Sequence, residues 1–184
     1  MERPGFSAAL LHPRYWLLWL GLGLLWLVIQ LPYRWLLALG RVVGWGMFHL
    51  MGERREVART NLALCFPEMS EIARERLLRE NFASNGIALF EMAMAWWWPR
   101  KRLAGLAHIE GLEHLTNAAA QGKGVVLMSL HFTTLEIGAA LLGQAVTIDG
   151  MYREHRNAAF DFVQRRGRER HNLDAKAVER EDVR

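Results

Sequence analysis

The chain has 184 residues, of which 52% are apolar, and it carries a formal net charge of +4 with an isoelectric point near 9.7. This length fits one domain with an attachment, and the basic balance favours a polyanionic partner, either nucleic acid or an anionic membrane surface. The single cysteine, Cys65, excludes an internal disulfide and favours a reducing compartment. Its apolar surroundings predict a buried, inert thiol rather than a nucleophile.

The first expected element is a membrane-spanning helix over residues 15–31, "YWLLWLGLGLLWLVIQL". This stretch has no charged residue, and aromatic and arginine side chains flank it. At 1.5 Å per residue it reaches roughly 25 Å, close to a bilayer span. A signal peptide fits less well because no small-residue cleavage site follows, and a buried core helix usually keeps polar residues on one face.

Residues 35–52 predict a helix at the membrane interface rather than a second span, because Arg41 and several glycines interrupt the apolar run. Arginines are more numerous after the predicted span than before it. The positive-inside rule then predicts a single-pass protein of the inner (cytoplasmic) membrane, with the body of the chain in the cytoplasm.

Residues 53–107 predict a helical segment. One helix ends near Pro67, Ser70 is a candidate N-cap for the next, and Glu75 and Arg79 have the favourable i,i+4 order. The second helix ends at Pro99, after three tryptophans and just before three basic residues. This patch fits lipid headgroups and fits equally well two core tryptophans beside a solvated loop.

From residue 108 the pattern changes to α/β. An amphipathic helix precedes a buried strand over 124–130, a helix over 132–143, a second strand over 145–153 and a helix over 157–171. This alternation predicts parallel strands with crossover helices. Ligands of such sheets bind at the carboxyl ends of the strands, where His131 and Arg153 are expected to lie.

The segment "HFTTLE" places a histidine just before a helix and a carboxylate inside its first turns. Glu136 is positioned to accept a hydrogen bond from Nδ1 of His131, which would prepare Nε2 to take a proton from a substrate hydroxyl. Backbone N–H groups at the helix start are suited to an oxyanion. Spacing alone also fits a capped helix start or a satisfied, half-buried histidine.

These segments resemble, in order, the late acyltransferases of lipid A synthesis, the lauroyl/myristoyl type within the glycerolipid acyltransferase superfamily. The hallmark of that superfamily is a histidine, four residues, then aspartate or glutamate, here His131 to Glu136. The likeness also covers the apolar N-terminal stretch, "RTNLALCFPEMS", "MAWWWP", "HIEGLEHL" and "MYREHRNAAFDFVQRRGRERHN". It extends over essentially the whole chain.

The resemblance implies transfer of a fatty acyl group from acyl carrier protein to a hydroxyl of a lipid A precursor, with no bound cofactor. It implies His131 as general base, Glu136 as its orienting carboxylate, and Arg153 as a phosphate or oxyanion ligand. Arg168 and Arg170 are further candidates for substrate binding, because guanidinium groups bind phosphate in a bidentate way. Membrane phospholipids are expected partners.

We therefore expect an α/β fold: a membrane anchor with an interfacial helix (1–52), a helical segment (53–107), and the first part of a mostly parallel sheet (108–184). Family members are longer, so the sheet is expected to be incomplete and the chain truncated, which leaves open whether this chain is active. A membrane-anchored lysophospholipid acyltransferase and an inactive membrane-tethered binding module remain alternatives. No metal-ligand spacing and no aromatic–basic platform for nucleic acid is visible.

Overall fold

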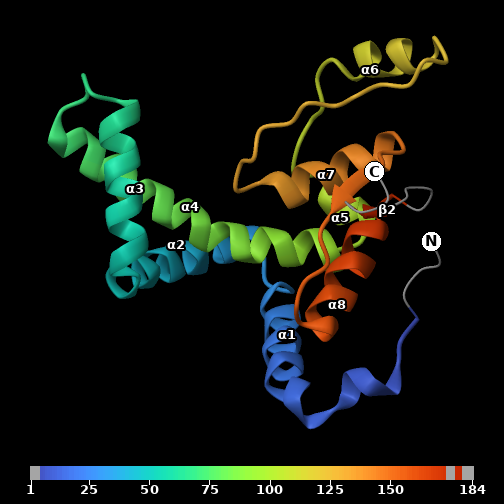
Figure 1. Ribbon diagram of the computed structural model, residues 1–184, viewed down its shortest axis with the longest axis horizontal. Coiled ribbons are helices and arrows are strands. Elements are labelled where there is room, and N and C mark those ends of the chain that lie inside the picture. The colour runs from blue at the N-terminus through green and yellow to red at the C-terminus, as the bar shows by residue number, and fades with distance from the viewer. Residues whose placement is uncertain (1–4, 173–176, 180–184) are drawn as a thin grey trace. The chain divides into compact units, whose positions relative to one another are not determined.

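The computed structural model describes residues 5–172 and 177–179. Its helices are η1 (Ala8–Leu11), η2 (Pro13–Tyr15), α1 (Trp16–Val28), α2 (Tyr33–Leu50), α3 (Gly52–Cys65), α4 (Glu71–Trp97), α5 (Arg100–Ala104), α6 (Leu112–Ala119), α7 (Leu135–Ala145) and α8 (Ala158–Glu169) (Figure 1). Its strands are β1 (Gly150–Tyr152) and β2 (Ala177–Glu179). They pair in parallel, with Gly150 opposite Ala177.

The chain forms two compact units. Unit 1 contains Met1–Leu24 and Ala93–Arg184, and unit 2 contains Leu25–Met92. The domain boundaries predicted after residues 52 and 107 stay a prediction.

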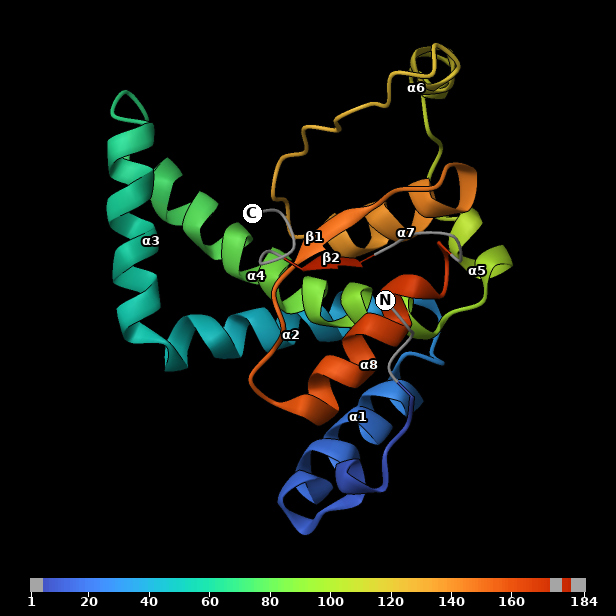
Figure 2. The ribbon, with the colours of Figure 1, turned by 45° about the vertical axis from the view of Figure 1, so that its right-hand side comes forward.

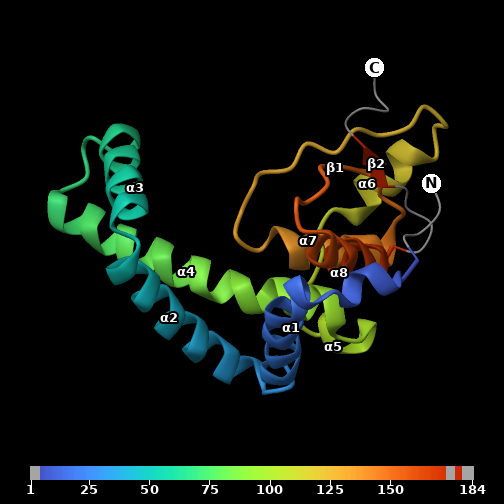
Figure 3. The same ribbon diagram turned by 60° about the horizontal axis from the view of Figure 1, so that its bottom comes forward.

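Unit 2 is built on a close pair of helices, α2 and α4, which run side by side (Figure 3). Glycines make this approach possible, because a Cβ on Gly44 would lie 2.3 Å from the carbonyl oxygen of Phe82, and one on Gly86 would lie 2.1 Å from that of Gly40. At these two positions, any side chain larger than the hydrogen atom of glycine would force the two backbones apart. Beside the crossing, Phe48 packs edge-on against Phe82 with ring centroids 5.5 Å apart.

Local sequence signals set the ends of α3 and α4, as predicted. α3 ends at Cys65, two positions before Pro67. The hydroxyl of Ser70 accepts from the backbone N–H of Ala73, which confirms the N-cap. The i,i+4 pair is also formed, since Arg79 donates to Glu75 at 3.2 Å.

Unit 1 has an apolar core in which α8 meets the N-terminal 3-10 helices. Leu10 and Tyr15 are buried together with Ala159 and Phe162. α7 packs against α5 and α8 (Figure 2). The helices predicted before residue 124, over 132–143 and over 157–171 are confirmed as α6, α7 and α8.

The predicted single-pass anchor is wrong for the described residues. The apolar stretch 15–31 does not form one helix: α1 has 13 residues, and Pro32 then begins α2 as its N-cap. Thirteen residues reach roughly 20 Å, well short of the roughly 30 Å hydrocarbon core. α2 is longer, but it carries Arg34 and Arg41. Among residues 5–172 and 177–179, none of the helices combines the length and the apolarity of a membrane span. This finding contradicts the predicted inner-membrane localisation with a cytoplasmic body.

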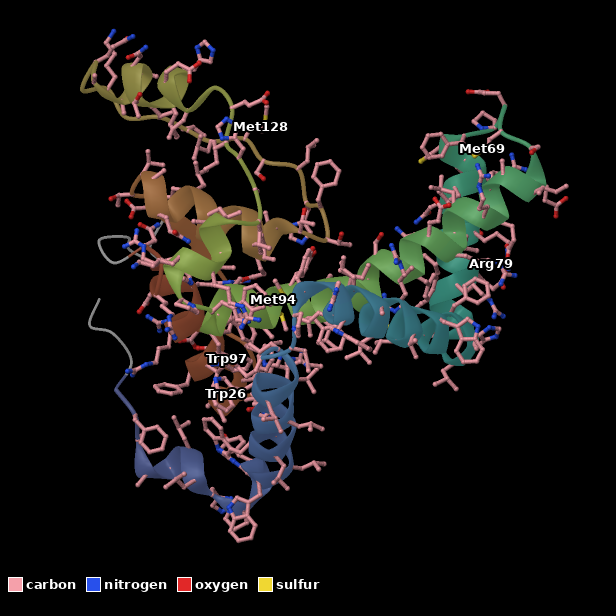
Figure 4. All side chains as sticks on the ribbon, turned by 180° about the vertical axis from the view of Figure 1, so that it is seen from behind. Trp26, Met69, Arg79, Met94, Trp97 and Met128 are labelled. Carbon is pink, nitrogen blue, oxygen red and sulfur yellow. The ribbon has the colours of Figure 1, made fainter. Side chains whose placement is uncertain are left out.

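The predicted α/β fold with a mostly parallel sheet is also wrong. The described residues are mainly helical, and their strands are the two short segments β1 and β2. Residues 124–130, predicted as a buried strand, follow an irregular path between α6 and α7 (Figure 2). A parallel strand needs a neighbour for its N–H and C=O groups, and apolar sequence alone does not supply one. Val126 and Met128 are accordingly 97% and 99% exposed; Figure 4 marks Met128 on this segment.

Candidate functional site in unit 1

His131 lies at the end of the irregular segment, four positions before α7 begins. It is exposed, and its imidazole makes no hydrogen bond with any residue that the structure describes. The turn that leads into the helix is closed by the backbone, where Leu135 N–H donates to the carbonyl of Phe132 at 3.1 Å. The imidazole is therefore open to a substrate.

Glu136 lies in the first turn of α7, and its side chain is 19% exposed. The carboxylate accepts two bonds from Nε of Arg168, at 3.0 and 3.2 Å, and a further short one from Nη2. The indole Nε1 of Trp96 donates to the same carboxylate at 3.2 Å. A guanidinium that donates through two nitrogens fixes both the position and the charge of its carboxylate partner. We refer to Glu136, Arg168 and Trp96 as the Glu136 cluster.

Packing between α4 and α8 places the Glu136 cluster. A Cβ on Gly167 would lie 2.4 Å from Cγ of Trp96, so the glycine admits the indole against the helix backbone. Trp96 also meets Phe160 edge-on, with ring centroids 5.7 Å apart. The indole is 1% exposed, and this rigid setting turns its N–H toward Glu136.

The structure brings together only one pair of the five predicted site residues, Glu136 with Arg168. The expected hydrogen bond between His131 and Glu136 is not formed in the described part, because the carboxylate faces α8. Arg153 is exposed just after β1, and Arg170 is exposed as the C-cap of α8. The roles assigned to these residues stay predictions.

Sequence reasoning missed Trp96 and Gly167 as residues of the site. Gly167 lies within the predicted helix 157–171, and a glycine inside a helix can indicate that another part of the chain packs closely against it. This signal could have pointed to the site. Nothing in the sequence singles out Trp96 from its two neighbouring tryptophans. Cys65 is exposed at the end of α3, so the predicted buried thiol is wrong.

The described site offers an exposed imidazole and, separately, a carboxylate fixed in an ion pair. Histidine is the side chain best suited to take and return a proton near neutral pH, and a carboxylate bound to a guanidinium orients its neighbours. In the part of the chain that the structure describes, no three metal-ligating side chains converge.

Comparisons with known proteins show the family to which the chain belongs. Residues 3–182 match the model of the bacterial lipid A biosynthesis acyltransferase family, so the chain belongs to that family, as the resemblance predicted. It is 46% identical over 169 residues to the lipid A biosynthesis lauroyltransferase of Escherichia coli (strain K12), covering 92% of this chain and 55% of the relative. It is 45% identical over 167 residues to the palmitoleoyltransferase of the same organism, covering 91% and 55%.

A lipid A biosynthesis acyltransferase of Haemophilus influenzae is 42% identical over 183 residues, covering 98% of this chain and 58% of the relative. The chain thus spans a little over half the length of the curated relatives it matches. No solved structure gives a significant match.

Proposed function

We propose that this protein transfers a fatty acyl group from acyl carrier protein to a hydroxyl of a lipid A precursor. The observation that carries the proposal is the family match over residues 3–182, which includes the histidine and glutamate of "HFTTLE". The names of the relatives give lauroyl and palmitoleoyl groups as transferred acyl chains, which supports the reaction class.

In this proposal His131 is the general base. It takes the proton of the accepting hydroxyl while that oxygen attacks the acyl carbonyl, and the proton then passes to the leaving group of the donor. Its exposure leaves room for the substrate at Nε2. No bound cofactor is needed for this step.

Glu136 orients and balances the charge of the imidazole while Arg168 holds the carboxylate in place. Contact between His131 and Glu136 requires the segment before α7 to fold against the first turn of that helix. Arg168, together with the exposed Arg153 and Arg170, binds the anionic groups of the substrate.

The test uses a chimera in which this chain replaces the matched part of the E. coli lauroyltransferase, because the chain covers 55% of that relative. Purified chimera is assayed for acyl transfer from acyl carrier protein to a lipid A precursor. His131→Ala is expected to lower turnover at least about a hundredfold, the usual scale for a general base. The matched control is His114→Ala on α6, an exposed histidine outside the site, which should leave turnover unchanged.

Three outcomes are informative. Equal turnover in the chimera and its His131→Ala variant would refute the proposed base. Preference for a lysophospholipid acceptor would identify a different acyltransferase. Binding of carrier protein without turnover would identify a binding module.

A further inference from the structure

Three elements of unit 1 meet at a point away from the Glu136 cluster: the start of α5, the end of α7 and the residues after α8. Arg100 donates through Nη2 to the backbone carbonyl of Gln144 at 3.2 Å. A Cβ on Gly143 would lie 3.0 Å from Cβ of Asn172, so the chain after α8 is in close contact with the end of α7. Asn172 also donates to the carbonyl of Ile148 at 2.6 Å.

Two side chains at this junction, the buried His171 and the half-buried Gln144, have buried polar atoms without a well-aligned hydrogen bond among the described residues. His171 is 1% exposed, and the backbone carbonyl of Ala95 is the acceptor near its ring, without a well-aligned hydrogen bond to either ring nitrogen. Nε2 of Gln144 is a buried donor without an acceptor. Buried donors are normally satisfied, so unsatisfied ones at a single junction indicate a missing acceptor.

The junction is also positively charged. Burial lowers the pKa of His171, and the positive charges of Arg170 and Arg100 lower it further, against the effect of the carbonyl of Ala95. Arg170 comes from the end of α8 and Arg100 from α5; α4 contributes the backbone carbonyl of Ala95, and α7 the neutral Gln144. Glu169 is the nearest acidic residue along α8.

We propose that Arg100, Gln144, Arg170 and His171 form a binding site for a phosphate monoester. We call these four residues the α5–α8 site. Two guanidinium groups offer bidentate donors, and Gln144 and His171 offer further donors to the remaining oxygens. A dianion balances the two arginines, whereas a diester carries one charge and offers fewer free oxygens.

The α5–α8 site differs from the Glu136 cluster in its free donors. Arg168 is already paired with a carboxylate, whereas Arg100 and Arg170 form no ion pair with described residues. Arg170 is also a substrate ligand in the proposed function, so the two proposals share this residue. Phosphate binding is measured without acyl transfer, so failure of one proposal leaves the other testable.

The direct test is calorimetric titration of the full chain with inorganic phosphate. Arg100→Gln and Arg170→Gln should each weaken binding about tenfold, as expected for loss of one charge-assisted hydrogen bond. The matched control is Arg76→Gln in unit 2, which removes the same charge from a side chain that is 78% exposed. Its effect should stay below about twofold, the scale of a screened, distant charge. Absence of saturable binding, or equal weakening by the control, would overturn the proposal.

Two further titrations identify the ligand and the part played by His171. Glucosamine 1-phosphate should bind more tightly than dimethyl phosphate; the reverse order would overturn the assignment to a monoester. Sulfate, which stays a dianion, should bind more tightly as the pH falls below about 6.5, because a bound anion favours the protonated imidazole. His171→Gln should abolish that pH dependence, and if this variant does not fold, the two arginine variants still decide the question.

Discussion

The α2–α4 pair and the segment between α6 and α7 are both rich in apolar residues, yet they fold very differently. In the helix pair, glycines bring two backbones into contact, and beside them Phe48, Leu78 and Phe82 form a buried apolar cluster. In the segment, Val126 and Met128 are almost fully exposed and the backbone forms no ladder. Apolar sequence therefore predicts burial only where the chain supplies the surface that covers it.

The largest expected effect is in the helix pair. Gly86→Leu should lower the free energy of unfolding by about 3 kcal/mol or more, because its Cβ would overlap backbone atoms of α2, which cannot move aside like a side chain. Urea denaturation measures the loss. Gly46→Ala is the matched control, since open space surrounds that glycine; it should be neutral or stabilising by up to about 1 kcal/mol. Equal effects of the two substitutions would contradict the close packing.

Gly167→Ala should cost about 2 kcal/mol, because the new methyl group overlaps the indole of Trp96. The indole is a side chain and can shift, so the cost is smaller than at Gly86. Displacement would also break the hydrogen bond to Glu136. Tryptophan fluorescence should change together with stability, and an unchanged spectrum would argue against the packing of α4 on α8.

Tyr33→Phe should cost about 1–2 kcal/mol, since the hydroxyl donates to Glu91 at 2.8 Å and that carboxylate is buried. Burial, with the hydrogen bond and charge of Glu91, raises the pKa of Tyr33 from 10.0 to about 12. A raised pKa means that this contribution is present below pH 10 and is lost as the pH rises toward 12. In Tyr33→Phe, the free energy of unfolding should fall less between pH 10 and pH 12 than it does in the parent protein. Identical pH profiles of stability for the two proteins would rule out the contact.

A smaller, pH-dependent effect is expected at His171. Burial lowers its pKa below the ordinary 6.5, so the unfolded chain binds a proton more readily than the folded one. The free energy of unfolding should therefore fall as the pH drops below about 6.5 in phosphate-free buffer. His171→Gln should flatten this slope; an unchanged slope would assign it to other groups.

The smallest effect is expected in the exposed segment. Met128→Lys should change the free energy of unfolding by no more than about 0.5 kcal/mol, because the side chain is 99% exposed. A loss of several kcal/mol would show that this segment packs like the helix pair, and the contrast between the two regions would be lost.

The sequence predicted what depends on near neighbours. The N-cap at Ser70, the end of α3 before Pro67 and the pair of Glu75 with Arg79 all follow from residues a few positions apart. The predicted strand over 124–130 failed because strand formation depends on a distant partner, and the predicted span failed because a break before Pro32 divides the apolar stretch.

The candidate site shows the same limit. The spacing of His131 and Glu136 was visible in the sequence. The partners of Glu136 were not, because Arg168 lies 32 residues after it and Trp96 lies 40 residues before it. Such contacts arise from helix packing, which no local pattern encodes.

The most direct test of the site is a double-mutant cycle on acyl transfer by the chimera, measured as kcat/KM for Glu136→Gln, Arg168→Gln and both together. If the ion pair acts as one unit, the double variant will be about as slow as the slower single variant. Losses that multiply would show that the two side chains act independently, and would contradict the Glu136 cluster as the centre of the site.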